Sequence, residues 1–136
     1  MKTYWDSSAL LNALASKEVY DRLDSGENVT RSHGYVEVFS HLTGRGLPKR
    51  DGSRRIVAPA DAAIMIESLS KRLSLRDLTF DETLSAMKAA KKAGVQGARI
   101  HDLLHATSAR LSGADLILTR DKSLGSIGQG IKAEWP

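Results

Sequence analysis

Apolar residues along the chain follow two spacings, one typical of buried strands and one typical of amphipathic helices. Short runs, most of them apolar, predict strands at Lys2 to Trp5, Asn28 to Arg31, Leu75 to Phe80, Ala114 to Thr119 and Ile131 to Trp135. Between these runs, apolar positions recur three or four residues apart, as on one face of a helix. This alternation predicts an α/β domain of three layers, in which helices flank a mostly parallel central sheet.

Residues that favour helix ends place the helices. Cap-type residues from Asp6 to Ser8 predict a helix through Leu14, and a second short helix is expected at Val19 to Leu23. Ser32 is expected to cap the next helix, Pro59 to stand in the first turn of another and Thr79 to open a third, and a further helix is expected from about Asp102 to Leu111. Thr79 with Glu82 is a capping-box pattern. The helix that follows it carries a face of small side chains at Ala86, Ala89, Ala90 and Ala93.

Length and composition limit what this domain can be. A chain of 136 residues suits one compact domain, 1–136, with a single active site. The absence of cysteine excludes disulfides, thiolate metal sites and thiol catalysis, and makes a reducing cytoplasm the expected compartment. The first residues do not resemble a signal peptide, and no apolar run approaches the length of a membrane span. A formal charge of +4 favours a polyanionic partner.

Acidic residues stand where predicted strands end. Asp6 directly follows the first strand, Asp121 follows the strand at Ala114 to Thr119, and Asp102 opens the helix that leads into that strand. Ligands of open parallel sheets bind beyond the carboxyl ends of the strands, so these three side chains are expected to share one edge. Glu37 lies within a predicted helix and could project into the same cleft.

Each acid also has a purely structural interpretation. Asp is a preferred helix N-cap, which would explain Asp6, Asp102 and Asp121 singly, and Glu37 alone would be a solvated helix residue. Several carboxylates in one cleft repel one another, however, and a protein that assembles them usually uses them to hold a cation. Carboxylate and water ligands without thiolate suit Mg²⁺ or Mn²⁺. Taken together, the acids therefore predict a metal-dependent site.

Three segments of the chain share their order and spacing with a known family. They are YWDSSALLNAL, SHGYVEVFSHL and HDLLHATSARLSGADLILTRDKSL. With these segments the chain resembles, over nearly its whole length, the PIN-domain nucleases, particularly the VapC-like toxins of bacterial and archaeal toxin–antitoxin pairs. In this resemblance the family's acidic quartet aligns with Asp6, Glu37, Asp102 and Asp121. Polar residues often found beside the metal align with Ser8 and Thr119.

The resemblance implies hydrolysis of RNA phosphodiester bonds with Mg²⁺ or Mn²⁺, leaving a 5′-phosphate and a 3′-hydroxyl. Asp6, Asp102 and Asp121 would bind the metal directly or through water. Glu37 would orient or deprotonate the attacking water, or serve as a further ligand. The implied partners are an RNA substrate, a cognate antitoxin protein that covers the acidic cleft, and a second copy of the chain in a homodimer.

Two other functions are compatible with the sequence. His101 and His105 stand in the pattern H-D-x-x-H, close to the spacing of two zinc ligands on one helical face, which would suit a zinc hydrolase. A noncatalytic RNA-binding or regulatory domain of the same fold is the other. The polar segment Gly44 to Arg55 either contacts phosphate or is only a solvated loop. Its cations are Arg45, Lys49, Arg50, Arg54 and Arg55.

Overall fold

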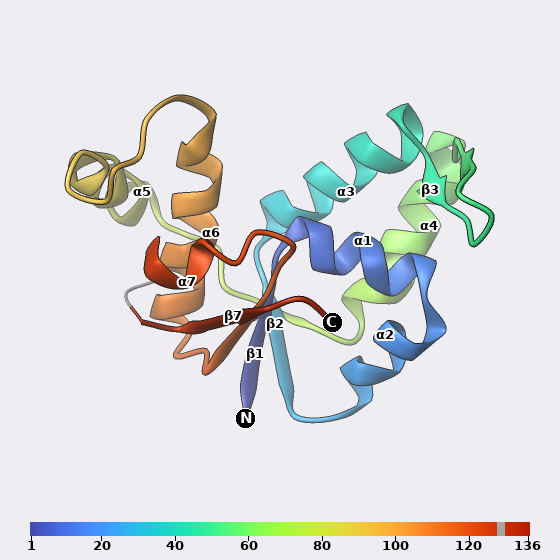
Figure 1. Ribbon diagram of the computed structural model, residues 1–136, viewed down its shortest axis with the longest axis horizontal. Coiled ribbons are helices and arrows are strands. Elements are labelled where there is room, and N and C mark those ends of the chain that lie inside the picture. The colour runs from blue at the N-terminus through green and yellow to red at the C-terminus, as the bar shows by residue number, and fades with distance from the viewer. Residues whose placement is uncertain (128–129) are drawn as a thin grey trace.

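A five-stranded sheet forms the centre of the computed structural model, which describes residues 1–127 and 130–136 (Figure 1). Its strands lie in the order β5-β2-β1-β6-β7, and neighbouring strands pair in parallel throughout. They are β1 (Lys2–Trp5), β2 (Glu27–Thr30), β5 (Ser74–Leu75), β6 (Leu116–Leu118) and β7 (Lys132–Glu134). Parallel strands need crossover connections, and helices supply them here.

Helices cover both faces of this sheet. They are α1 (Ser7–Ala15), α2 (Lys17–Asp21), α3 (Ser32–Gly44), α4 (Pro59–Ser70), α5 (Phe80–Ala89), α6 (Ile100–Leu111) and α7 (Leu124–Ile127). Short 3₁₀ turns stand at Arg22–Asp24 and Gly97–Arg99. In Figure 1, α1 to α4 gather on one side of the strands, whereas α5, α6 and α7 lie on the other. The predicted three-layer α/β fold is confirmed. Within the described residues, no helix has the length and apolar character that crossing a membrane requires.

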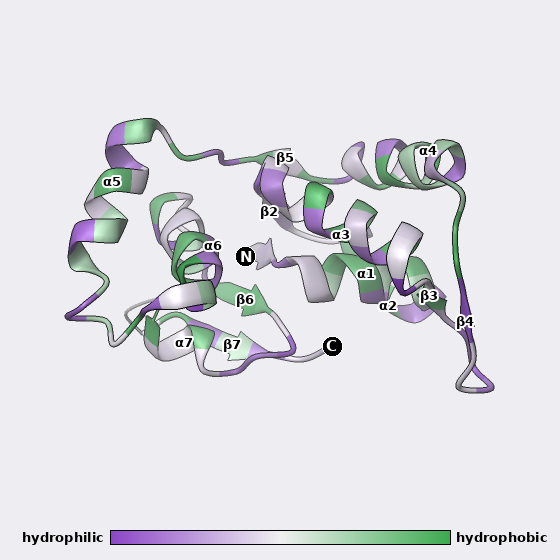
Figure 2. Cartoon of the chain, turned by 90° about the horizontal axis from the view of Figure 1, so that it is seen from above, coloured by the Kyte–Doolittle hydropathy of each residue, from purple (hydrophilic) through white to green (hydrophobic). Residues whose placement is uncertain are grey.

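Neighbouring side chains of β1 supply the two halves of the core, because side chains in a strand point alternately to opposite faces. Trp5 is fully buried in a cluster with residues of α1 to α4 and with Leu118. Tyr4, equally buried, belongs to the cluster on the other face, with Ile117 and with Ala109 of α6. β1 and β6 are therefore buried on both faces and lie inside the sheet. The hydrophobic colouring of β6 in Figure 2 agrees with this position.

The strand expected at Leu75 to Phe80 is much shorter in the structure. β5 ends at Leu75, and α5 already begins at Phe80, so the prediction was wrong beyond Leu75. The side chains of Leu75 and Phe80 are 54% and 76% exposed. β5 is an edge strand, so an apolar residue in or after it is not necessarily buried, whereas the aromatic residues of the central strand β1 are.

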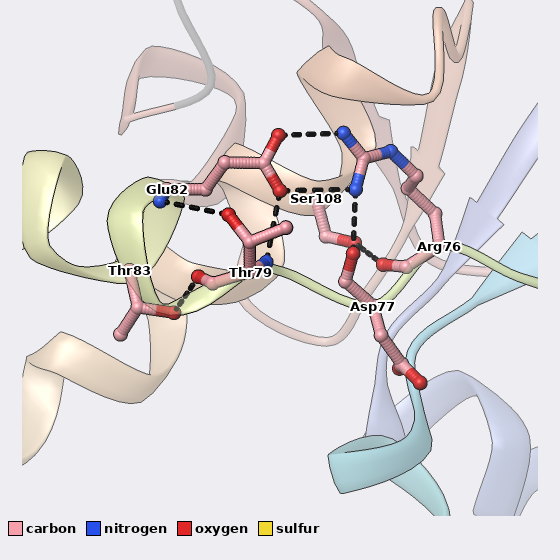
Figure 3. A network of polar contacts seen from close by, with 6 residues as sticks. All are labelled: Arg76, Asp77, Thr79, Glu82, Thr83 and Ser108. Atoms are coloured by element: carbon pink, nitrogen blue, oxygen red, sulfur yellow. Dashed lines mark hydrogen bonds and ion pairs between the residues drawn. The ribbon is translucent and has the colours of Figure 1, made fainter.

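The chain leaves β5 through a network of polar contacts that fixes the start of α5 (Figure 3). The predicted capping box is present: the Thr79 hydroxyl accepts from the Glu82 amide at 3.1 Å, and the Glu82 carboxylate accepts from the Thr79 amide at 2.9 Å. Arg76 also donates to Glu82 at 2.7 Å. The Ser108 hydroxyl of α6 donates to the Arg76 carbonyl, so the same network ties this segment to α6.

Two predicted helix starts were displaced. Ser32 is the first residue of α3, and Arg31 stands at the cap position without a side-chain cap bond. The Asp77 carboxylate, 45 residues away in the chain, accepts from the Ser32 amide at 2.6 Å and from its hydroxyl at 2.7 Å. Helix α6 begins at Ile100, so Asp102 lies in its first turn. A tertiary contact therefore replaces the expected local cap of α3.

Two expected surface features also differ. The polar segment Gly44 to Arg55 contains a short antiparallel hairpin of β3 (Leu47–Pro48) and β4 (Arg54–Arg55), coloured hydrophilic around β4 in Figure 2. Of the small side chains on α5, Ala86 is buried whereas Ala89 is exposed. Helix α5 packs against α6 along one side only, so the buried face of α5 is narrower than the predicted face of four alanines.

Candidate active site

Asp6 lies at the junction of β1 and α1 and is almost fully buried, with 7% of its surface exposed. It is the N-cap of α1, because one carboxylate oxygen accepts from the Ala9 amide at 3.0 Å. The same oxygen accepts from the Ser8 hydroxyl at 2.6 Å, and the other accepts from the Thr119 hydroxyl. The structural interpretation of Asp6 therefore holds. Its carboxylate is also held in one orientation, because it accepts hydrogen bonds from the start of α1, which follows β1, and from Thr119, which follows β6.

Thr119 brings Asp121 to the same edge of the sheet. β1 pairs with β6 so that Trp5 lies opposite Leu118, and the residues that follow the two strands become neighbours. The Thr119 hydroxyl, which donates to Asp6, also accepts from the Asp121 amide at 3.0 Å. The Asp121 carboxylate accepts from the Ser123 hydroxyl at 2.5 Å and from its amide at 3.0 Å. These hydrogen bonds lower the pKa of Asp121, and the bond from the Ser123 hydroxyl has the larger effect.

Asp102 faces the other aspartates from the first turn of α6. Burial raises the pKa of its carboxyl, and the negative charges of Asp121 and Asp6 raise it further. Arg99 opposes this effect because its guanidinium lies 3.9 Å from Asp102 and 4.0 Å from Asp121. Arg99 also donates to the Ser123 hydroxyl at 3.1 Å. The three aspartates thus share one electrostatic environment, as expected from the strand ends.

Glu37 of α3 is bound to His105 of α6 by a hydrogen bond. Its carboxylate lies 2.8 Å from Nε2 of His105, a buried residue of α6 whose Nδ1 lies 2.7 Å from the Tyr4 hydroxyl. Burial alone would raise the pKa of Glu37, but the hydrogen bond from His105 and the charges of His105, His33 and His101 outweigh it, and the pKa is lowered. The charge of His105 lowers the pKa of Asp102 as well. His105 therefore lies between Glu37 and the aspartates electrostatically.

The chemistry of this donor set fits Mg²⁺ or Mn²⁺. The aspartates offer carboxylate oxygens, with hydroxyls beside them and no thiolate, which is the set that these ions prefer. Burial first, and then the charge of Asp121, raises the pKa of Asp102, and a divalent cation would favour its ionised form. Among the described residues, no three His, Asp or Glu side chains are already arranged to hold an ion.

The histidines do not combine into a zinc site. Both ring nitrogens of His105 face protein partners, which leaves no nitrogen for a metal. His101 is exposed and stacks on His33, with ring centroids 5.5 Å apart and planes at 11°. The H-D-x-x-H spacing therefore does not bring His101 and His105 to one ion.

The cations of Gly44 to Arg55 lie on the hairpin and beside it, and all five are exposed. Arg54 is anchored, with one guanidinium nitrogen 3.2 Å from Nε2 of His41. Burial lowers the pKa of His41, and the charges of Arg54, Arg45 and Arg120 lower it further. Arg120, which directly precedes Asp121, was not expected from the sequence. Its guanidinium lies over the Trp135 ring, 4.8 Å from the centroid.

Other residues near the acids also escaped the sequence analysis. Arg99 has a local signal, since it precedes Asp102 by three positions and can pair with it along the helix. No local signal in the sequence indicates a polar role for Tyr4, because an aromatic residue in a central strand is expected to belong to the hydrophobic core. A groove of about 780 Å³ between α5, α6 and α7 is lined by other residues, including Leu103 and Leu111. Its lining does not include the predicted site acids Asp6, Glu37, Asp102 and Asp121.

Comparisons with known proteins agree on the fold. The family model described as PIN domain matches residues 3–129. A search of curated proteins found no match. The crystal structure of PAE2754 from Pyrobaculum aerophilum is similar, with a TM-score of 0.67 and 20% identity over 98% of this chain and 89% of that one. VapBC2 from Rickettsia felis, solved bound to a DNA fragment from its promoter, gives a TM-score of 0.66 and 13% identity over 98% of both chains.

Proposed function

The chain belongs to the PIN domain family, and on that premise we propose that it is a metal-dependent endoribonuclease that hydrolyses RNA phosphodiester bonds, the toxin of a toxin–antitoxin pair. PIN domains are generally nucleases that use divalent metal ions. The observation that carries the proposal is that Asp6 and Asp121 follow the carboxyl ends of β1 and β6, while Arg99 lies within 4.0 Å of both Asp121 and Asp102, whose pKa is raised by burial and by the charges of Asp121 and Asp6. A cluster with this electrostatic cost is expected where a cation is bound.

Each residue has a distinct role in this proposal. Asp6, Asp102 and Asp121 hold Mg²⁺ or Mn²⁺, which supplies the positive charge that stabilises the phosphate and makes a water more acidic. Ser8 and Thr119 fix the orientation of the Asp6 carboxylate through their hydroxyls. Glu37, kept ionised by its lowered pKa, accepts the proton of the attacking water.

The remaining roles concern partners. The exposed cations Arg45, Lys49, Arg50, Arg54 and Arg55 contact RNA phosphates. VapBC2, a toxin–antitoxin complex, is among the similar structures, and by analogy a cognate antitoxin covers the acidic edge of this chain. Self-association into a homodimer and a cytoplasmic location complete the proposal. The proposed location agrees with a chain that has no cysteine.

Cleavage of RNA by antitoxin-free protein tests this function. Single-stranded RNA should be cut with Mg²⁺ or Mn²⁺ and left intact with EDTA. Asp121→Asn should abolish cleavage, whereas the matched control Asp61→Asn, at an exposed position in the first turn of α4, should retain it. Activity that survives chelation would refute metal dependence. RNA binding without cleavage under all metal conditions would instead support the noncatalytic domain.

A further inference from the structure

His105 is a buried polar residue with both ring nitrogens engaged. Only 3% of its surface is exposed, and it lies within a run of α6 whose residues are all buried. Its Nδ1 lies 2.7 Å from the Tyr4 hydroxyl, and its Nε2 lies 2.8 Å from the Glu37 carboxylate. The three groups come from β1, α6 and α3, so one side chain connects three elements.

The chemistry of the neighbours decides which nitrogen of His105 carries the proton. Burial raises the pKa of Tyr4, so its hydroxyl stays protonated and can donate to Nδ1. Glu37 has a lowered pKa and is therefore an acceptor only. A neutral ring that accepts at Nδ1 must carry its hydrogen on Nε2, where it donates to Glu37. The Glu37 carboxylate, which can only accept, thus requires the hydrogen on Nε2, and the Tyr4 hydroxyl occupies Nδ1.

Packing leaves the ring little freedom to turn. α3 approaches it at Gly34, where an added Cβ would lie 3.6 Å from Cε1 of His105 and 3.1 Å from the hydroxyl of Thr30. The Thr30 hydroxyl is itself held, since it donates to the Trp5 carbonyl at 2.8 Å. The planes of the His105 and Tyr4 rings lie at 67° to each other, with centroids 5.8 Å apart. The ring is therefore held from both sides.

We propose that His105 is a positioning residue for the nuclease reaction: with its Nδ1 bound to Tyr4, it holds the Glu37 carboxylate in the orientation that receives the proton of the attacking water. This inference rests on the proposed function. Glu37 stands on a helix surface with 31% of its side chain exposed, and a free Glu side chain there samples several rotamers. The His105 hydrogen bond selects one of them.

Two substitutions of similar chemistry separate the two hydrogen bonds. His105→Gln places its amide near the position of Nε2 and keeps a donor for Glu37. His105→Asn reaches only the position of Nδ1 and keeps the contact with Tyr4. We expect His105→Asn to lower kcat about 10- to 100-fold, as losses of groups that orient catalytic ligands do. KM for RNA should stay within about twofold, and His105→Gln should retain most of kcat. Equal kcat values for the two variants, with losses that follow their melting temperatures, would overturn the proposal.

A double-mutant cycle tests whether His105 acts through Glu37. In the Glu37→Gln background, His105→Asn should cause little further loss of kcat, because the group that it positions is gone. Losses that multiply would overturn the proposal. Wild-type protein that does not cleave RNA would refute the proposed function. The hydrogen-bond geometry of His105 can still be tested in that case, because NMR spectra of the protein need no RNA. Long-range ¹H–¹⁵N spectra should show His105 protonated on Nε2. A neutral ring protonated on Nδ1 would overturn the positioning role independently of activity.

Discussion

Replacing Asp102 with Asn should stabilise the metal-free protein while abolishing cleavage. Burial and the charges of Asp121 and Asp6 raise the pKa of Asp102, which means that its ionised form is disfavoured in the folded state. Asn has nearly the same shape and removes the charge. The variant loses the loose pair with Arg99 at 3.9 Å and the weaker attraction to His105. Its metal-free melting temperature should therefore rise.

The expected gain is small because the site is open to solvent. The Asp102 side chain is 37% exposed, and charge interactions at such positions contribute about 1 kcal/mol or less after screening. For a domain of 136 residues the unfolding entropy is about 0.3 kcal/mol per kelvin near the melting temperature. Asp102→Asn should thus raise the melting temperature by about 1 to 3 °C in EDTA at pH 7, measured by calorimetry.

The pH dependence has a definite sign. A carboxyl whose folded-state pKa is raised destabilises the fold fully above that pKa, and the cost disappears below the unfolded-state value of about 3.9. The difference between Asp102→Asn and wild type should therefore shrink as the pH falls through the raised pKa of Asp102 towards that value. Asp61→Asn, at an exposed position, should show no such gain at pH 7.

Addition of Mg²⁺ completes the test. A tenfold excess over Kd stabilises a folded protein by about 1.4 kcal/mol, or about 5 °C here, and this gain should be smaller in Asp102→Asn. If Asp102→Asn lowers the melting temperature in EDTA and still cleaves RNA with an unchanged response to Mg²⁺, Asp102 is a structural residue and its assignment to the site is wrong.

Two further predictions concern the hairpin and α5. Neutralising Arg50, Arg54 and Arg55 should weaken RNA binding and reduce the slope of log K against log salt by about 2, because three phosphate contacts are lost on a single strand. A control set on the α5 side, Lys88, Lys91 and Lys92, should leave the slope unchanged, and an unchanged slope in the hairpin variant would assign it to solubility. The hydrogen bond from Arg76 holds the pKa of Glu82 at about 2, below its ordinary value of 4.5. Glu82→Gln should therefore lower the melting temperature at pH 7, and the difference should vanish as the pH falls from 4.5 towards 2, whereas a difference that persists at pH 2 would exclude the ion pair as its source.

Local sequence determined the elements whose causes are local. The capping box of Thr79 and Glu82 forms because both partners lie within one turn, and Asp6 caps α1 for the same reason. The positions of β1 and β6 inside the sheet could also be predicted, because a short apolar strand in a three-layer fold is buried where helices cover both of its faces. The meeting of Asp6 with Asp121 follows in turn, because neighbouring parallel strands end at one edge of the sheet.

Tertiary structure alone decided the features that join distant segments. Asp77 takes over the cap of α3 from 45 residues away, and no pattern around Ser32 could indicate it. The sequence placed Glu37 on a helix but could not show which partner it meets. That partner, His105, was open to a zinc interpretation until the packing of α6 between Tyr4 and α3 used both its nitrogens. Backbone periodicity specifies which face of an element is buried, whereas the rotation and approach of packed elements decide which polar groups meet across that face.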